Sequence, residues 1–208
     1  MKIICIFGAT GTGKTTFIQS LISTSKTIIE PIYIGPLVKV APSFKEIFEN
    51  YMKGKCTVDK IDENPKIVNL IIDKINSINS TDKEAVIIDG FPRTPEHLES
   101  FNELIDSKHD LTFLHFNEQD LSKIKNRIVC PSCKIVYNKK TMKPKTEGQC
   151  DTCQTKLVCK EEDKDVHTRD KNFKKQEDLI LETFGKLNLK FSSFSSNQDS
   201  IELKKTLF

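Results

Sequence analysis

The chain has 208 residues, a formal net charge of +3 and seven cysteines. This length suits one domain with small insertions and is sufficient for a substantial buried core. The weak net charge argues against a protein that coats nucleic acid, and no apolar stretch approaches the roughly 20 residues of a membrane span. Because strand-like sequence begins at Lys2, we expect no signal peptide. We therefore expect a cytoplasmic protein whose cysteines form no disulfide framework.

The first predicted strand leads directly into a glycine-rich loop. The apolar residues 3–7 precede Gly8-Ala9-Thr10-Gly11-Thr12-Gly13-Lys14-Thr15, which fits the pattern G-x-x-x-x-G-K-[ST]. Between a buried strand and a helix, this pattern predicts backbone N–H groups that surround phosphate oxygens. Lys14 would reach the β- and γ-phosphates, with the Thr15 and Thr16 hydroxyls near a Mg²⁺. A chance glycine-rich turn is the alternative, but the flanking elements favour nucleoside triphosphate binding.

Strands and helices are predicted to alternate along most of the chain. Apolar runs bounded by turn residues predict strands at 2–7, 27–34, 84–88 and 111–116. Helical periodicity predicts helices at 65–78, 95–107, 118–128 and 164–186. The C-terminal part is predicted to form a strand at 187–191, a serine-rich turn and a helix from residue 199. This order predicts an α/β fold with a parallel sheet, expected to have five strands, flanked by helices.

A second motif follows the strand predicted at 84–88. The hexapeptide Asp89-Gly90-Phe91-Pro92-Arg93-Thr94 places a carboxylate at the end of a buried parallel strand, where it can hold the waters of a Mg²⁺. The tight turn would direct Arg93 into the crevice where α/β proteins bind ligands, and a guanidinium there can bind phosphate through two hydrogen bonds. The alternative is a structural ion pair between Asp89 and Arg93.

Four cysteines interrupt the alternating pattern. Cys130 and Cys133 form one C-x-x-C pair, and Cys150 and Cys153 form another. This spacing is typical of a zinc ribbon, in which two such pairs supply all four ligands of a tetrahedral ion. Because no position is left for water, we predict a structural zinc rather than a redox pair or a catalytic zinc. The segment 129–160 is therefore interpreted as an insertion that a metal holds together.

In this order, the phosphate loop, the hexapeptide and the cysteine-rich insertion resemble adenylate kinases of the long-lid, zinc-containing type, over almost the whole chain. The resemblance implies a P-loop kinase fold with a zinc-ribbon lid and reversible, Mg²⁺-dependent phosphoryl transfer from ATP to AMP. It implies nucleotides as partners, with no membrane or nucleic acid, and a monomer. It divides the chain into a core of 1–34, 66–126 and 161–208, an acceptor-binding region of 35–65 and a lid of 127–160.

The resemblance also implies roles for individual residues. The implied catalytic residues are Lys14, Arg93, Arg127 and Arg169. The implied ATP site comprises Gly8, Ala9, Thr10, Gly11, Thr12, Gly13, Lys14, Thr15, Thr16, Lys123, Arg127 and Tyr137. The implied acceptor site comprises Ile34, Gly35, Lys39, Gly90, Arg93, His97, Lys160 and Arg169. The implied metal ligands are Cys130, Cys133, Cys150 and Cys153 for Zn²⁺, with Thr15, Thr16 and Asp89 near the Mg²⁺ that accompanies ATP.

Several positions depart from the family pattern. Thr10 replaces a proline of the loop, and Lys39 replaces an acceptor-side arginine. Ile34 and His97 replace the threonine and the glutamine that recognise the acceptor adenine in the family. His97 is interpreted either as a contact to the acceptor base or as a histidine on a helix surface. Other acceptors, such as UMP, CMP or a deoxynucleotide, are therefore an alternative, and a P-loop ATPase with a nucleic-acid-binding zinc ribbon is another.

Overall fold

The computed structural model describes residues 1–78, 83–120, 124, 126–133, 135–140, 142–159, 166–194 and 207. Its larger sheet has five parallel strands in the order β2-β3-β1-β4-β8. These strands are β1 (Lys2–Phe7), β2 (Ile29–Tyr33), β3 (Ala85–Asp89), β4 (Asp110–Phe116) and β8 (Ser192–Phe194). The predicted α/β fold with a parallel five-stranded sheet is confirmed.

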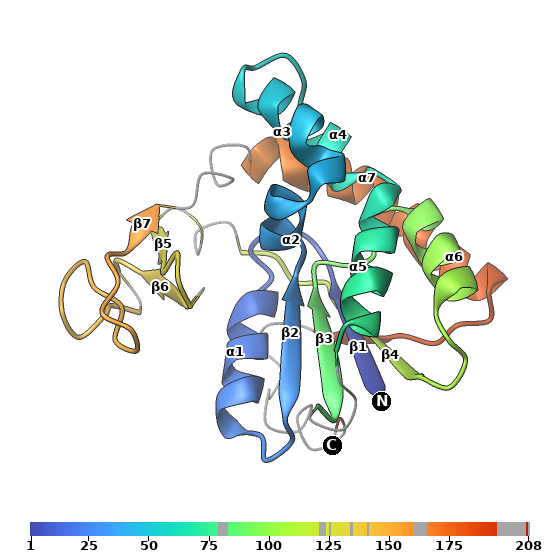
Figure 1. Cartoon of the computed structure of the whole chain (residues 1–208), viewed down its shortest axis with the longest axis horizontal. Helices are drawn as coiled ribbons and strands as arrows, with labels where there is room; N and C mark the ends of the chain where they lie inside the picture. Colours follow the sequence, from blue (N-terminus) through green and yellow to red (C-terminus); the bar gives the residue numbers. More distant parts are fainter. Residues whose placement is uncertain are drawn as a thin grey trace.

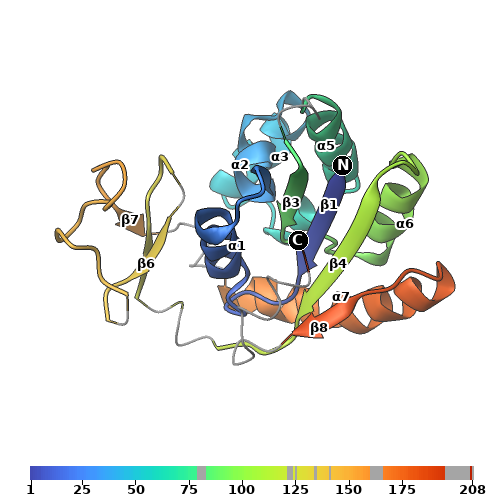
Figure 2. The same cartoon turned by 90° about the horizontal axis from the view of Figure 1, so that it is seen from below.

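Helices cover both faces of this sheet (Figure 1). They are α1 (Lys14–Thr24), α5 (Lys66–Asn76), α6 (Pro95–Leu104) and α7 (Val166–Lys186). Because successive strand residues point to opposite faces, Ile4 and Ile6 of β1 join a core with α1, whereas Ile3 and Cys5 join a second core with the other three helices. Figure 2 shows α7 beside β4 and β8. Burial on both faces explains why the strands are almost continuously apolar.

Two smaller parts extend from the large sheet. One follows β2 and consists of α2 (Ile34–Val40), a 3-10 turn (Pro42–Phe44), α3 (Lys45–Met52) and α4 (Asp59–Asp62). The other is an antiparallel sheet of β5 (Arg127–Val129), β6 (Val136–Asn138) and β7 (Val158–Cys159). Figure 1 shows this small sheet to one side of the molecule, beyond α1. Gln19 of α1 accepts a hydrogen bond from the Val136 amide at 3.4 Å, which links the small sheet to α1.

The helix predicted at 118–128 is wrong in the part that the structure describes. Residues 117–120 have no regular secondary structure, and β5 begins at Arg127. Instead, the Gln119 amide donates to the Thr10 carbonyl at 2.7 Å, and the Asp120 N–H donates to the Gly11 carbonyl at 3.4 Å. Hydrogen bonds to the glycine-rich loop therefore hold this segment, in place of the intrahelical bonds that its periodicity predicted.

The strand predicted around residues 187–191 forms slightly later in the chain. Leu187, Leu189 and Phe191 pack against the core from irregular chain, and the strand is formed by the next residues, Ser192–Phe194. The helix predicted from residue 199 lies outside the described residues, apart from Leu207. Leu207 is buried against the α1 side of the sheet. Within the described ranges, no helix is long and apolar enough to cross a membrane.

Candidate active site

The phosphate loop has the backbone geometry that its glycines permit. Gly8, Gly11 and Gly13 all have positive φ angles, of 135°, 93° and 90°. At Gly8, an added Cβ would lie 2.2 Å from the carbonyl oxygen of Phe116, so no larger residue fits between the loop and β4. The Lys14 ammonium donates to the carbonyls of Gly8 at 2.8 Å and Ala9 at 2.6 Å. The loop therefore encloses its own lysine at the N-terminus of α1.

A hydroxyl and a carboxylate meet beside this loop. Asp89 ends β3, whose register with β1 pairs it with Ile6, two residues before the loop. The Thr15 hydroxyl donates to the Asp89 carboxylate at 2.7 Å, and both line the same cavity, as does the exposed Thr16. Oxygen ligands of this kind suit Mg²⁺, which binds proteins through one or two carboxylates together with substrate phosphates. Asp89, Thr15 and Thr16 could therefore hold the Mg²⁺ that accompanies ATP.

A cluster of two arginines and one aspartate forms the opposite part of the site. Arg169 of α7 donates to both carboxylate oxygens of Asp62, from Nε at 2.7 Å and from Nη2 at 3.0 Å. Arg93 donates to the same carboxylate from Nη1, and its Nε donates to the Gly90 carbonyl at 3.0 Å. The Arg93 and Asp62 side chains are only 17% and 18% exposed. Arg93 thus forms its ion pair with Asp62, not with Asp89, which corrects the alternative drawn from the hexapeptide.

Arginine is scarce in this chain and concentrated at this site. The sequence contains only three arginines, Arg93, Arg127 and Arg169, and all three line one cavity of about 750 Å³. Arg127 reaches the cavity from the first residue of β5. Lysines make up the rest of the 32 basic residues and are distributed along the whole sequence. Because the planar guanidinium binds phosphate oxygens in pairs, its confinement to one cavity indicates a site for phosphate groups.

The four cysteines of the small sheet come together at one point. The sulfurs of Cys130, Cys133, Cys150 and Cys153 all lie within 4.8 Å of one another. A zinc ion at about 2.3 Å from each sulfur requires sulfurs roughly 3.8 Å apart, so the cluster could hold zinc after small adjustments. A hydrogen bond with the Thr155 hydroxyl is the main cause that lowers the pKa of Cys153 to about 6, which favours the thiolate that a metal needs.

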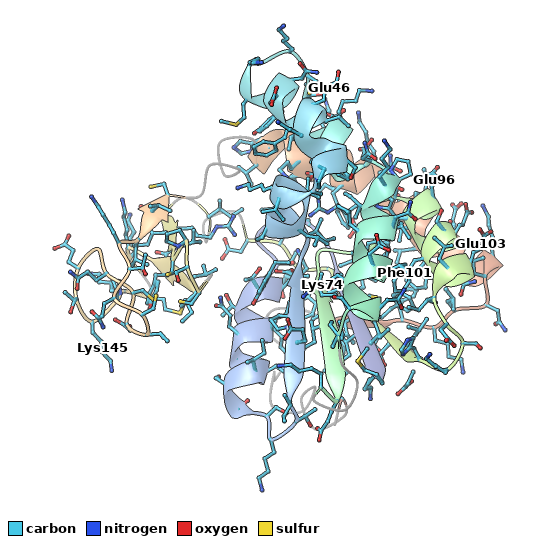
Figure 3. The ribbon with its side chains drawn as sticks, viewed as in Figure 1. Glu46, Lys74, Glu96, Phe101, Glu103 and Lys145 are labelled. Carbon is cyan, nitrogen blue, oxygen red and sulfur yellow. The ribbon has the colours of Figure 1, made fainter. Side chains whose placement is uncertain are left out.

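Tyr137 connects this cluster to the cavity. Its side chain lines the cavity, yet only 5% of the residue is exposed. Its hydroxyl accepts a hydrogen bond from the Asp151 N–H at 2.9 Å and lies 3.6 Å from the Cys150 sulfur. The hydroxyl is therefore directed to the cysteine cluster, and a role of Tyr137 in ATP binding stays a prediction. Figure 3 shows Lys145 at the outer end of the same region, away from the large sheet.

His97 is a buried residue of α6. It is 0% exposed, so the interpretation as a helix-surface histidine is wrong. Its ring stacks on Phe91, and its Nε2 lies 3.0 Å from the Asn64 carbonyl oxygen. Burial is the main cause that lowers the pKa of His97 to about 4. His97 is not among the residues that line the cavity, so a contact to an acceptor base stays a prediction without support from its position.

The remaining predicted site residues divide into three groups. Lining the cavity are Gly8, Thr10, Gly11, Gly13, Lys14, Ile34, Gly35, Lys39 and Gly90. Ala9 and Thr12 are buried within the loop, where the Thr12 hydroxyl donates to the Ala9 carbonyl at 3.0 Å. Lys123 and Lys160 lie outside the described residues. Asp62 was missed, because no sequence pattern marks an aspartate at the end of a four-residue helix.

Comparison with known proteins identifies the family. The family described as "Adenylate kinase, active site lid" matches residues 127–161. An adenylate kinase of Mycoplasma capricolum is 34% identical over 96% of this chain and 93% of its own length. The chain belongs to the adenylate kinase family. An adenylate kinase of Petrotoga mobilis is 28% identical over 99% of this chain and 95% of its own length, and one of Thermococcus kodakarensis is 33% identical over 80% and 74%.

As a member of the adenylate kinase family, this chain is a phosphotransferase that binds nucleotides. The family match falls on the segment that contains the small sheet and its cysteine cluster, which we call the lid from here on (residues 127–161). The resemblance drawn from the sequence motifs is thereby confirmed. The roles of individual residues remain predictions.

Proposed function

We propose that this chain catalyses reversible phosphoryl transfer from MgATP to AMP. One observation carries the proposal: a single cavity is lined by the phosphate loop with Lys14, by the arginine pair Arg93 and Arg169, and by Arg127 of the lid. A plain ATPase needs one phosphate-binding loop, whereas a kinase for a monophosphate needs a second phosphate site facing the first. The arginine pair supplies that second site, so we assign the ATP phosphates to the loop and the acceptor phosphate to the pair.

The residues of this site act by alignment and charge neutralisation. The attacking group is a phosphate oxygen, which is already anionic at neutral pH, so no general base is needed. Lys14 would turn from the carbonyls of its own loop towards the β- and γ-phosphates. Arg93, Arg127 and Arg169 would neutralise the charge on the transferred group and hold the two phosphates in line. Each cation is most effective where charge develops in the transition state.

Two metal ions belong to this proposal. Thr15, Thr16 and Asp89 would hold the Mg²⁺ of MgATP directly or through water, and the chemistry that such an ion would supply is neutralisation of phosphate charge. The four lid cysteines would hold a structural Zn²⁺, because all four ligand positions are filled by protein sulfur. In the described part of the lid, the buried apolar cluster around Ile128, Tyr137 and Leu157 is small, so a metal would help to fix the shape of this segment.

We further propose a division of the chain by role. Residues 1–34, 66–126 and 161–208 would form the core, 35–65 would bind the acceptor and 127–160 would cover the donor. Closure of the lid over the cavity would exclude water, which otherwise would hydrolyse ATP. The chain would act as a cytoplasmic monomer.

A coupled assay of nucleoside diphosphate formation tests the proposal. MgATP is supplied with AMP, dAMP, GMP, CMP, UMP or dTMP in separate reactions, and one reaction contains no acceptor. We expect rapid turnover with AMP and little loss of ATP without an acceptor. Loss of ATP at the same rate in every reaction would favour an ATPase, and a salt-dependent gel shift with RNA or DNA would then test the ribbon as a nucleic-acid site.

The other candidate function is phosphoryl transfer to a monophosphate other than AMP, and one observation favours it. Ile34 and His97 occupy the positions at which the family recognises adenine, and His97 is buried away from the cavity. The adenine amino group would therefore lose one expected hydrogen-bond partner. If the assay shows faster turnover with UMP, CMP or a deoxynucleotide, the phosphate chemistry stands and the acceptor base is reassigned.

A further inference from the structure

The Asp62 carboxylate binds Arg93 and Arg169 through hydrogen bonds that a phosphate group could also accept. From the two arginines, its two carboxylate oxygens receive three hydrogen bonds, two from Arg169 and one from Arg93. All three side chains are less than a fifth exposed, and all three line the cavity. A carboxylate and a phosphate group bind guanidinium in the same way, through pairs of parallel N–H···O bonds. Asp62 thus places an anionic group on the arginine pair, at the end of the cavity that we assign to the acceptor.

We propose that Asp62 is an internal competitor of the acceptor phosphate. Its carboxylate binds Arg93 and Arg169 when the site is empty and leaves them when a phosphate group arrives. This inference rests on the proposed function, which assigns the acceptor phosphate to these two arginines. It adds a residue that weakens acceptor binding and sets the acceptor KM, a role that the motifs of the sequence did not indicate.

Charge explains why the carboxylate and the phosphate compete instead of binding together. The two guanidinium groups carry two positive charges, and Asp62 cancels one of them. A monophosphate brings close to two negative charges at neutral pH, so binding beside Asp62 would set like charges within a few ångströms of each other. Asp59 and Glu63 also line this part of the cavity. Burial is the main cause that raises the pKa of Glu63, and the charges of Asp59 and Asp62 raise it further.

The position of Asp62 in the fold gives this exchange a structural consequence. Asp62 is the last residue of α4, whereas Arg93 follows β3 and Arg169 belongs to α7. The ion pairs therefore tie the acceptor-side helices to two separate parts of the core. A phosphate that displaces Asp62 would break this tie and release α4 to move against the ligand. A purely structural role predicts the opposite, because Asp62 would then fix both arginines for the phosphate and its loss would weaken binding.

The test compares Asp62→Asn with Asp73→Asn. Asp73 is exposed on α5, so its variant makes the same charge change on the surface. We measure kcat and KM for AMP in the coupled assay, and the Kd of inorganic phosphate by calorimetry without nucleotide. In Asp62→Asn, we expect the AMP KM and the phosphate Kd each to fall about three- to tenfold, with kcat changed less than twofold. Asp73→Asn should match the parent protein.

A rise of the phosphate Kd in Asp62→Asn, or no change, would overturn the proposal. The phosphate measurement needs no kinase activity, so it separates this inference from the proposed function. Tighter phosphate binding without turnover of AMP would contradict the proposed function and leave the inference about Asp62 intact. A readout on the parent protein covers the case in which Asp62→Asn does not fold. Inorganic phosphate should then accelerate amide hydrogen exchange in α4 (Asp59–Asp62), and slower exchange there would contradict displacement.

Discussion

The two phosphate sites that we propose for this molecule are built in different ways. The proposed loop for the donor phosphates is one continuous segment, in which residues 8–15 enclose the Lys14 ammonium with backbone carbonyls. The acceptor site is assembled from three distant segments: Arg93 after β3, Arg169 on α7 and Asp62 on α4. The first depends on backbone angles that glycines allow locally, whereas the second depends on the packing of helices and strands. A local motif can therefore be recognised in a sequence, but a site shared by several elements must be found in the fold.

The donor site should be the more sensitive of the two. We expect Lys14→Met to lower kcat about 10³-fold, because a cation that acts on the transferred phosphoryl group is lost. The AMP KM should change little, since Lys14 lies at the loop and not at the arginine pair. Lys145→Met, on the outer end of the lid, is the control (Figure 3). Steady-state kinetics with both substrates varied measure these effects. If the AMP KM rose as much as kcat fell, the assignment of Lys14 to the ATP phosphates would be contradicted.

At the acceptor site we expect a smaller loss. Arg93→Ala should lower kcat/KM for AMP about 10²-fold, because one of two guanidinium groups remains. Arg93→Lys keeps the charge without the paired donors, so its loss should be intermediate, about tenfold. Initial rates at subsaturating AMP measure both variants. Equal activity of Arg93→Lys and the parent protein would show that charge alone, and not paired hydrogen bonding, matters here.

The lid, for which we propose a structural zinc, can be compared with the large hydrophobic core. Cys150→Ser should abolish zinc retention and raise the ATP KM about tenfold, since a lid without its metal no longer keeps its shape. Circular dichroism of the helices should hardly change, because the core packs independently of the cysteine cluster. Elemental analysis checks the zinc content, with Cys56→Ser as the control outside the lid. Full zinc content in Cys150→Ser would remove this cysteine from the ligand set.

The smallest expected effect concerns stability against acid. Burial lowers the pKa of His97 from 6.5 to about 4, so the unfolded chain binds the proton more tightly than the folded one. The free energy of unfolding should therefore decrease as the pH falls from about 6.5 towards about 4. Between pH 7 and pH 5.5 the contribution of His97 amounts to about 1 kcal/mol.

Urea unfolding at both pH values measures this contribution. His97→Gln should lose about 1 kcal/mol less than the parent protein over this interval, because glutamine does not titrate. His167→Gln, at an exposed position on α7, should behave like the parent protein. An identical pH dependence in all three proteins would mean that His97 accepts its proton equally in the folded and unfolded states.

Where the sequence predictions failed, tertiary contacts had replaced local preference. The periodicity of 118–128 suits a helix, but Gln119 bonds to Thr10 of the loop and to Asp170 of α7, at 2.7 and 2.6 Å. The apolar residues 187–191 suit a strand, but they pack on the core, and Ser192–Phe194 completes the sheet by pairing with β4. His97 follows a polar pattern on its helix, yet the packing of Phe91 and Asn64 buries it.

The sequence by itself determined the parts of this protein that depend on adjacent residues. These are the apolar strands β1 and β3, the glycine-rich loop and the two cysteine pairs, because strand burial, positive φ angles and metal-ligand spacing are encoded within a few positions. Only the tertiary structure decided that all three arginines face one cavity and that Asp62 joins two of them. These groups are up to 107 residues apart in the chain, and no local preference brings such distant side chains together.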